Sequence, residues 1–434
     1  MPENAHPEPS RLSRRLGLRD AVIVGLGSML GAGAFSAFGP AASEAGSALL
    51  IGLAIAAVVA YCNAASSADL AANYPESGGT YAYGRHQLGE SWGFLAGWAF
   101  ISGKVASAGA MAFTFAAYVA PDFARPIAAI VVLAVLAVNL AGVKKTATVT
   151  TVIVAFTLTV LAIVVVSVFV GDAGRAARVD PLSAGASPRE ILASGAVLFF
   201  AFAGYARIAT LGEEVKQPRR TIPRAILLAL AIVLIVYAVV ALSALAAVGA
   251  PALAATDAPL EVVVSGGDWA ALEPIVRVGA AIASLGVLVA LLAGIGRTTF
   301  AMAANRDMPP LLAAVSDRTK VPQRAEIAAA IAVLVVIAVG DVRAAIAFSS
   351  VLVLTYYAIA NGSAMRLPRN RRLQPLVVSI VGLIGCVALA TALPPSTLIP
   401  GAAVLGAGIL LALVRYRGAG WTRRMPGDDT GITP

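Results

Sequence analysis

The sequence predicts an all-α membrane protein with about twelve transmembrane helices. Only 13% of its 434 residues are charged and 59% are hydrophobic, whereas soluble domains carry about 25% charged residues. Apolar runs recur from one end of the chain to the other. Each is about twenty residues long, enough for a helix to cross the ~30 Å hydrocarbon core of a bilayer. These 434 residues leave no stretch that could form a separate soluble domain.

We expect the spans in a fixed order along the chain. They cover residues 20–45, 47–72, 91–120, 124–142, 146–170, 190–214, 222–249, 272–303, 325–341, 344–366, 374–393 and 397–415. Several exceed the length that a bilayer needs, which permits a tilt or a break. Residues 1–19 are polar and Pro-rich, show no cleavage site of a signal peptide, and are expected to form a disordered cytoplasmic tail. Residues 416–434 are expected to form a second cytoplasmic tail.

The distribution of basic residues predicts the orientation of these spans. With the N-terminus inside, 24 of the 32 Lys and Arg residues fall in cytoplasmic segments and 5 in outer segments. Lys104, Arg207 and Arg277 lie within spans. This asymmetry follows the positive-inside rule and predicts a multi-pass plasma-membrane protein with both ends in the cytoplasm. The net charge of +9 therefore reflects topology, and we expect no nucleic-acid partner.

The chemistry of the side chains argues against an enzyme. Cys62 and Cys386 lie in separate apolar runs, and His6 and His86 are the only histidines. A metal set or a nucleophile with its base is therefore not expected, and neither is a prosthetic group. The sequence contains no GxxxxGK[ST] stretch for ATP and nothing that resembles a selectivity filter, which disfavours a pump or a channel.

The first span contains the glycine-rich stretch GLGSMLGAGAF, Gly25–Phe35. Glycine in a helix interior costs roughly 1 kcal/mol relative to alanine. One explanation is close helix packing, because Gly27 and Gly31 have the GxxxG spacing. The other is a deliberate break, which exposes N–H groups on one side and carbonyl groups on the other. Such a break could hold an amino acid, because N–H groups suit its carboxylate and carbonyl groups suit its ammonium.

The sixth span contains a second candidate break. It reads VLFFAFAGYARIATLGEEVKQPRRTIPRAI, with Gly204 among aromatic residues and Arg207 just after it. Paired interruptions in two halves of a chain indicate a transporter built from inverted repeats. We therefore expect two five-helix repeats, at residues 20–170 and 190–366, followed by two additional helices at residues 374–415.

At these residues the chain resembles the amino acid–polyamine–organocation (APC) superfamily of permeases. Besides the two stretches above, the resemblance rests on GRTTFAMAANRDMPPLLAAV, Gly296–Val315, and on YPESGGTYAYGRHQLGESWGFLAGW, which follows the second span. It covers nearly the whole chain. It implies a secondary transporter of amino acids with spans 1 and 6 unwound beside the substrate.

The resemblance also implies which residues bind the substrate. The N–H groups around Gly31, Ala32 and Gly33 would meet the carboxylate. The carbonyls near Met29, Leu30, Phe200 and Ala201 would meet the ammonium, and Phe202, Gly204 and Tyr205 would shape and gate the pocket. The alternative for Phe199, Phe200 and Phe202 is ordinary packing against lipid or core.

Three further residues are candidates for coupling transport to an ion. Lys104 lies mid-span, where a charge costs on the order of 2.5–3.5 kcal/mol and should face a cavity or a partner. Many APC members carry a lysine in span 5, where this chain has Thr157, so we hypothesise that Lys104 supplies that charge from span 3. Snorkelling or a static ion pair is the alternative for Lys104. Many APC members have an acidic residue beside the span-6 aromatic, where this chain has Ala206 and then Arg207. Arg207 could pair with a carboxylate or guard the site against cationic substrates, and it therefore disfavours arginine or lysine as the substrate.

We therefore expect a secondary active transporter of amino acids that works by alternating access. Proton-coupled uptake, with H+ as the candidate coupling ion, is our first hypothesis. Exchange or export of amino acids or amines is the alternative, and Thr157 leaves sodium coupling open. The expected partners are the amino acid substrate and the lipid bilayer, with no obligate protein partner.

Overall fold

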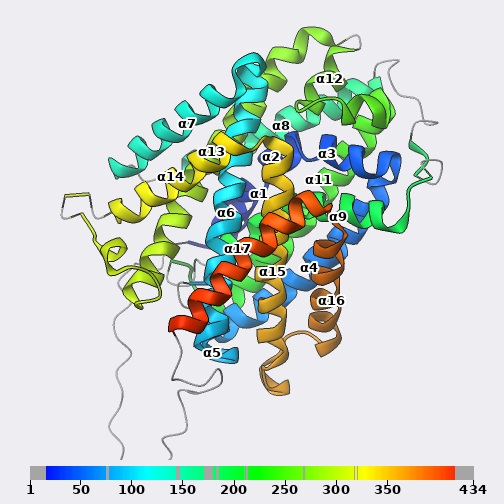
Figure 1. The fold of residues 1–434 in the computed structure, drawn as a ribbon. Coiled ribbons are helices and arrows are strands. Elements are labelled where there is room, and N and C mark those ends of the chain that lie inside the picture. Colours follow the sequence, from blue (N-terminus) through cyan, green and yellow to red (C-terminus); the bar gives the residue numbers. More distant parts are fainter. Residues whose placement is uncertain are drawn as a thin grey trace, which may run out of the picture.

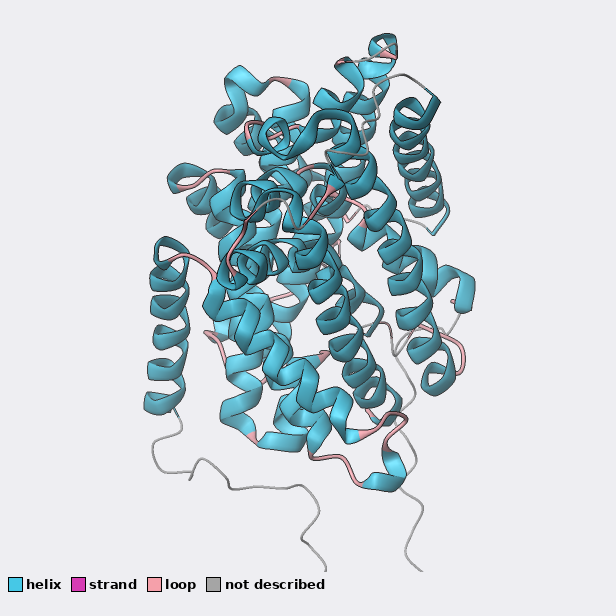
Figure 2. Ribbon diagram, turned by 90° about the vertical axis from the view of Figure 1, so that its right-hand side faces the viewer, coloured by secondary structure: helices cyan, strands magenta, loops and turns pink. Residues whose placement is uncertain are grey.

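The computed structural model describes residues 16–74, 78–142, 147–170, 179–181, 185–209, 211, 214–266, 269–316, 318–319 and 321–415. Within these ranges it consists of helices joined by short loops and turns (Figure 2). The all-α prediction is confirmed. The predicted tail at 416–434, and all but the last four residues of the tail at 1–19, lie outside the described residues.

Each of the twelve predicted spans corresponds to helical structure. The first span is α1 (Leu18–Met29), α2 (Ala32–Phe35) and α3 (Phe38–Ala45), and the sixth is α9 (Pro188–Phe202), the 3-10 turn η4 (Ala203–Tyr205) and α10 (Ala206–Ala209). The other ten are α4 (Leu49–Asn73), α6 (Glu90–Val119), α7 (Ala124–Leu140), α8 (Ala147–Val170), α11 (Pro218–Ala254), α13 (Glu273–Ala304), α14 (Gln323–Val339), α15 (Val342–Met365), α16 (Leu376–Ala392) and α17 (Pro395–Arg415).

Nine of the described helices are long and apolar enough to cross a membrane. The three predicted spans outside this set are span 1, which is interrupted, and α14 and α16, which have 17 residues each. Seventeen residues lie at the short end of the range for a membrane helix. The division into two five-helix repeats stays a prediction.

Two short helices lie at opposite ends of the molecule. The helix α5 (Thr80–Leu88) lies at one end and α12 (Pro259–Ser265) at the other (Figure 1). We call these the inner and outer ends, following the predicted charge asymmetry. At the inner side of span 6, the backbone of Leu16 pairs with the segment after it, through bonds to Glu214 (3.0 Å) and Lys216 (2.8 Å).

The helix α6 forms the centre of the helix bundle. It packs against α13 and α15, with α7 and α14 on one side and α4, α9 and α16 beyond α15 (Figure 1). The peripheral helices leave large apolar side chains uncovered, such as Ile130 of α7 (61% exposed) and Val414 of α17 (67% exposed). Apolar surface of this extent on the outside of a bundle suits contact with lipid.

Local sequence signals account for several helix ends. The helix α9 begins with a capping box, in which Ser187 accepts a hydrogen bond from the N–H of Glu190 and the Glu190 side chain accepts one from Ser187. Pro188 occupies the first helical position, where a missing N–H costs nothing. At the outer end of α15, Asp341 caps the helix by accepting from the N–H of Ala344 at 2.8 Å.

Candidate functional site

The helix of span 1 is broken at Leu30 and Gly31. The helix α1 ends at Met29, Leu30 has φ −78° and ψ 74°, and Gly31 has φ −141° and ψ −131° before α2 begins. The N–H of Gly31 donates to the carbonyl of Met29 at 2.9 Å, outside the helical pattern. The N–H of Ala32 donates to the sulfur of Met111 at 3.3 Å, which is a weak acceptor. The break predicted from the glycines is present at this position.

Span 6 is interrupted less completely than the sequence analysis predicted. After Phe202 the chain tightens into the 3-10 turn η4 and continues as α10 at Ala206. The backbone at Ala203 stays close to helical values, with φ −65° and ψ −2°. A 3-10 turn redirects its carbonyl groups without parting the chain. Span 6 therefore offers carbonyl oxygens from a continuous backbone, whereas span 1 offers a true gap.

Spans 1 and 6 touch through glycines that leave no room for a side chain. A Cβ atom added to Gly33 would lie 2.6 Å from the Cα atom of Ala201. A Cβ atom added to Gly204 would lie 2.3 Å from the carbonyl oxygen of Ser28. The hydroxyl of Ser28 donates to the carbonyl of Gly204 at 3.1 Å. The glycines therefore bring the backbones of the two interrupted spans into direct contact.

Tyr237 of α11 bridges the two interruptions, and the sequence analysis did not find it. Its hydroxyl donates to the carbonyl of Met29 at 2.7 Å and to the carbonyl of Ala201 at 3.1 Å. One hydroxyl proton is thus shared between two carbonyls that the resemblance assigns to an ammonium group. The ring packs edge-on against Phe202, with 5.2 Å between centroids. A polar atom in the middle of an otherwise apolar span was the available signal.

Lys104 of α6 reaches the interruption of span 6. Its ammonium donates to the carbonyl of Ala203 at 3.2 Å, and the hydroxyl of Tyr357 donates to the same oxygen at 3.2 Å. The nitrogen also lies 6.0 Å from the centre of the Phe100 ring. Lys104 is 7% exposed, which argues against snorkelling. Among the described residues no carboxylate forms an ion pair with it.

The other predicted site residues fall into two groups. Leu30, Phe200 and Tyr205 are buried near the interruptions, and the Tyr205 ring lies 5.1 Å from that of Tyr357. Thr157 instead donates to the carbonyl of Ile153 in its own helix, at 2.8 Å. Arg207 of α10 lies towards the inner end, where its charged neighbours are Arg297 and Glu214.

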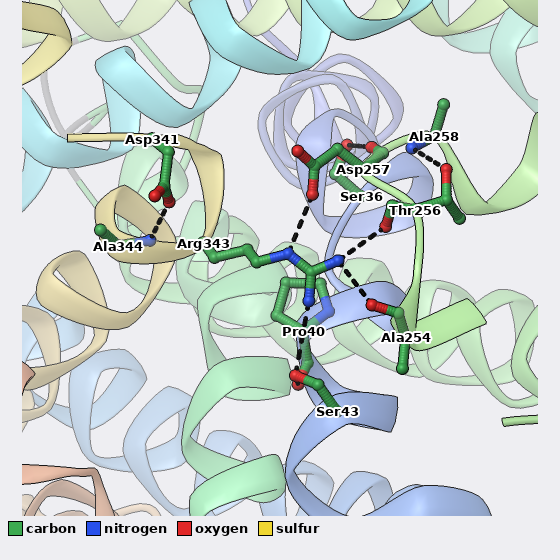
Figure 3. Close-up of polar contacts among 10 residues, drawn as sticks. All are labelled: Ser36, Pro40, Ser43, Ala254, Thr256, Asp257, Ala258, Asp341, Arg343 and Ala344. Atoms are coloured by element: carbon green, nitrogen blue, oxygen red, sulfur yellow. Dashed lines mark hydrogen bonds and ion pairs between the residues drawn. The ribbon is translucent and has the colours of Figure 1, made fainter. Parts of the chain in front are cut away.

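At the outer end, a cluster of polar contacts around Arg343, which we call the outer latch, joins several helices (Figure 3). From the start of α15, Arg343 forms an ion pair with Asp257 at 2.9 Å and donates to the carbonyls of Ala254 (2.8 Å) and Thr256 (3.0 Å). Ala254 is the last residue of α11, and Thr256 and Asp257 belong to the connection between α11 and α12. Ser36, just beyond the break in span 1, donates to the carbonyl of Asp257 at 3.2 Å. The outer latch thus ties span 10 to the end of span 7 and to span 1.

At the inner end, a second ionic cluster is centred on Asp307. Its carboxylate lies 2.6 Å from Arg85 of α5 and 3.3 Å from Arg415 at the end of α17, and the side chain is 2% exposed. The hydroxyl of Tyr81 donates to it at 2.6 Å. Burial and this bond raise the pKa of Tyr81 to about 12, so the phenol keeps its proton at neutral pH. The cluster joins the two loop motifs that the sequence analysis singled out, and adds the last helix to them.

Comparison with known proteins is consistent with this geometry. A family model described as amino acid permease matches residues 20–393. An uncharacterized transporter of Mycobacterium tuberculosis is 55% identical, covering 98% of this chain and 96% of the relative. The branched-chain amino acid permease BcaP of Bacillus subtilis is 27% identical, covering 72% of this chain and 71% of that protein. The methylthioribose transporter of the same species is 30% identical over 74% of each.

The contact between spans 1 and 6 predicts a stability difference between two glycine variants. Gly204→Ala should destabilise the protein by about 1–3 kcal/mol, because backbone atoms of Ser28 must move to admit the methyl group. Gly294→Ala of α13 is the control, since nothing lies within 4 Å of the added atom. We expect thermal unfolding in detergent to show a lower midpoint for the first variant and an equal or higher midpoint for the second. Equal midpoints would contradict the tight contact.

Proposed function

The chain belongs to the amino acid permease family, and on that premise we propose that it carries a neutral α-amino acid across the plasma membrane by alternating access, coupled to protons. Family membership places it among transporters. The observation that carries the proposal is the gap in span 1, which opens against the carbonyl groups of span 6. Backbone polar groups are tolerated at membrane depth only where protein or ligand satisfies them.

The substrate ammonium would bind to the carbonyls of Met29 and Ala201. The Tyr237 hydroxyl donates its one proton to both carbonyls. Each of these two hydrogen bonds is therefore weaker than a bond from a donor that serves one carbonyl alone. An ammonium has three donors and a full charge, and a charged hydrogen bond contributes about 1.5–3 kcal/mol against roughly 1 kcal/mol for a neutral one. An incoming ammonium can therefore compete with the tyrosine hydroxyl.

The substrate carboxylate would bind to the N–H groups that follow the gap, at Gly31, Ala32 and Gly33. The N–H of Ala32 donates only to the thioether of Met111, which a carboxylate oxygen would readily replace. The contribution of the four-residue α2 itself is small, so the direct N–H bonds carry the interaction.

A neutral side chain fits the charges around the site. Lys104 is buried at the span-6 turn, and Arg207 and Arg297 lie further towards the inner end. These positive charges would repel a substrate with a cationic side chain. Among the described residues no carboxylate forms an ion pair with Lys104, so nothing offsets that repulsion. The relative named as a branched-chain permease supports the same class of substrate.

Proton coupling would act through Lys104. In its charged form the lysine donates a strong bond to the carbonyl of Ala203 and so holds the span-6 turn. The neutral amine is a weaker donor, so loss of a proton would free the turn and change the balance between conformations. We place both chain ends in the cytoplasm, because the basic residues concentrate on that side. Sodium coupling is the alternative: the Thr157 hydroxyl donates to the carbonyl of Ile153, which leaves its oxygen able to ligate a cation.

The substrate class is tested by counterflow in proteoliposomes. Vesicles loaded with leucine, alanine, lysine, a simple amine or methylthioribose would be assayed for uptake of the same labelled compound, at two pH values and with or without sodium. We expect exchange of neutral amino acids without a sodium requirement. Exchange of methylthioribose alone would refute the substrate class while leaving a transporter, because one family relative carries that name.

The role of Lys104 is tested by two variants with opposite charge states. Lys104→Gln removes the charge, and Lys104→Arg keeps a charge that cannot be lost. Both should keep counterflow at reduced rate, lose accumulation driven by a pH gradient, and show a flat dependence on pH. A wild-type pH profile in either variant would rule out Lys104 as the proton carrier.

Alternating access requires the outer latch to open, and Ser36 can report that opening. Ser36 is fully buried, so Ser36→Cys should react slowly with a membrane-impermeant maleimide. Adding Arg343→Ala should speed labelling by about tenfold, if the latch contributes roughly 1.4 kcal/mol to closure. The exposed Ser265→Cys on α12 is the control and should react equally in both backgrounds. Unchanged labelling of Ser36→Cys would show that Arg343 does not hold the outer end closed.

A further inference from the structure

A stripe of buried polar side chains leads from the site towards the inner end, between α4, α15 and α16. We call it the polar seam. Its members are Tyr357, Asn361, Asn63, Cys386, Ser66, Ser379 and Asp69, and each is at most 6% exposed. On α4 the positions 63, 66 and 69 are three residues apart, so they share one face of the helix. Polar groups at this depth are costly and mark either helix contacts or ion pathways.

The upper end of the polar seam begins at the oxygen that binds Lys104. The Tyr357 hydroxyl and the Lys104 ammonium both donate to the carbonyl of Ala203. One turn along α15, the Asn361 side chain donates to the carbonyl of Tyr357 at 3.0 Å and to the side chain of Asn63 at 2.6 Å. Tyr357 therefore joins the two ends of this arrangement: its hydroxyl shares an acceptor with Lys104, and its backbone carbonyl accepts from Asn361.

In the middle of the polar seam, a buried hydrogen-bond acceptor has no donor among the described residues. The side-chain oxygen of Asn361 is buried and hydrogen-bonds to none of the described residues. Gly382 lies against it, where a Cβ atom would come within 2.6 Å of that oxygen. A buried oxygen without a donor is costly unless water supplies one. This atom points to at least one internal water beside Asn361.

The lower end of the polar seam is a carboxylate near the inner surface. The hydroxyls of Ser66 and Ser379 lie 2.9 Å apart, one turn below Asn63. One further turn along, Asp69 accepts from the N–H groups of Leu373 (3.1 Å) and Gln374 (3.4 Å). At 1.5 Å per residue, Asn63 and Asp69 are about 9 Å apart along α4, a distance that a few waters span.

We propose that the polar seam is a hydrated proton route between Lys104 and the inner solution, ending at Asp69. In one passage, water that enters the polar seam takes a proton from the Lys104 ammonium, which becomes a neutral amine. The waters pass a proton along, and the Asp69 carboxylate accepts one and releases it to solvent. The side chains of Asn361, Asn63 and the two serines hold the waters in line. The inference rests on the proton coupling proposed above and adds the path to it.

The charged and titratable groups around the polar seam are compatible with this direction of transfer. Near Lys104 they are the phenols of Tyr356 and Tyr357 and, beside them, Tyr205. In the middle they are the thiols of Cys386 and Cys62. At the lower end Arg372 faces Asp69 from the loop before α16. Of the groups named here, Asp69 alone is a carboxylate. It is therefore the group in the polar seam that can accept a proton at its inner end.

The test separates proton movement from substrate exchange. Proteoliposomes with an entrapped pH dye report protons moved, and labelled substrate reports counterflow, for Asn361→Leu, Ser66→Ala and Asp69→Asn. Ser243→Ala is the matched control, a buried serine of α11 outside the polar seam. We expect all variants to keep counterflow within about twofold. The three variants in the polar seam should lower proton flux per substrate by about tenfold, as for the loss of one hydrogen bond to the water chain.

The outcomes distinguish this inference from the proposed function. If the wild type exchanges substrate without moving protons, proton coupling is absent and the route falls with it. If the wild type is coupled and both Asn361→Leu and Ser66→Ala stay coupled, the route alone is overturned. If Asn361→Leu loses counterflow and proton flux together while Ser66→Ala loses neither, the polar seam is a packing contact and the route is likewise overturned.

Discussion

The rest of the structure depends on the contact between the interrupted spans 1 and 6. Gly33 against Ala201 and Gly204 against Ser28 leave no space for a side chain, so two backbones meet at membrane depth. Their free polar groups cannot turn to water there and must be satisfied by protein or ligand. Tyr237, Lys104 and Ser28 each donate to a carbonyl of these spans. This shortage of partners makes the interruption costly, and it is the reason why we propose that a ligand binds there.

The donors that satisfy these carbonyls come from helices that belong to different parts of the fold. Tyr237 comes from α11, Lys104 from α6 and Tyr357 from α15. A change in charge or position at any of them would alter how firmly span 6 is held. At the two ends, the outer latch and the Asp307 cluster join different helices through ion pairs. Neutral and charged donors thus hold the interruptions in the core, and ion pairs hold the helices together at both ends.

The family and the fold constrain the chemistry without deciding the substrate. In the binding mode that we propose, backbone groups at the interruptions recognise what all α-amino acids share, a carboxylate and an ammonium. Selection of the substrate side chain would then depend on a few residues, among which Phe202 and Tyr205 are fully buried and Lys104 carries a charge. The relatives include one named for branched-chain amino acids and one named for methylthioribose, so membership of the family does not by itself assign a substrate.

The sequence by itself determined the properties that depend on neighbours along the chain. Hydropathy marked the helical segments, nine of which are, among the described residues, long and apolar enough to cross a membrane. The glycines marked the gap at Leu30 and Gly31, because segment length and helix propensity are local. The sequence also drew attention to Lys104, since a charge in an apolar run is visible without a structure.

The tertiary structure decided which residues these groups contact. It showed that span 6 tightens rather than parts, that Thr157 bonds within its own helix, and that Tyr237, Arg343, Asp307 and Asn361 join helices far apart in the chain. Those partners could not be deduced beforehand, because which helix faces meet is fixed by packing across the whole bundle and not by spacing within any one span.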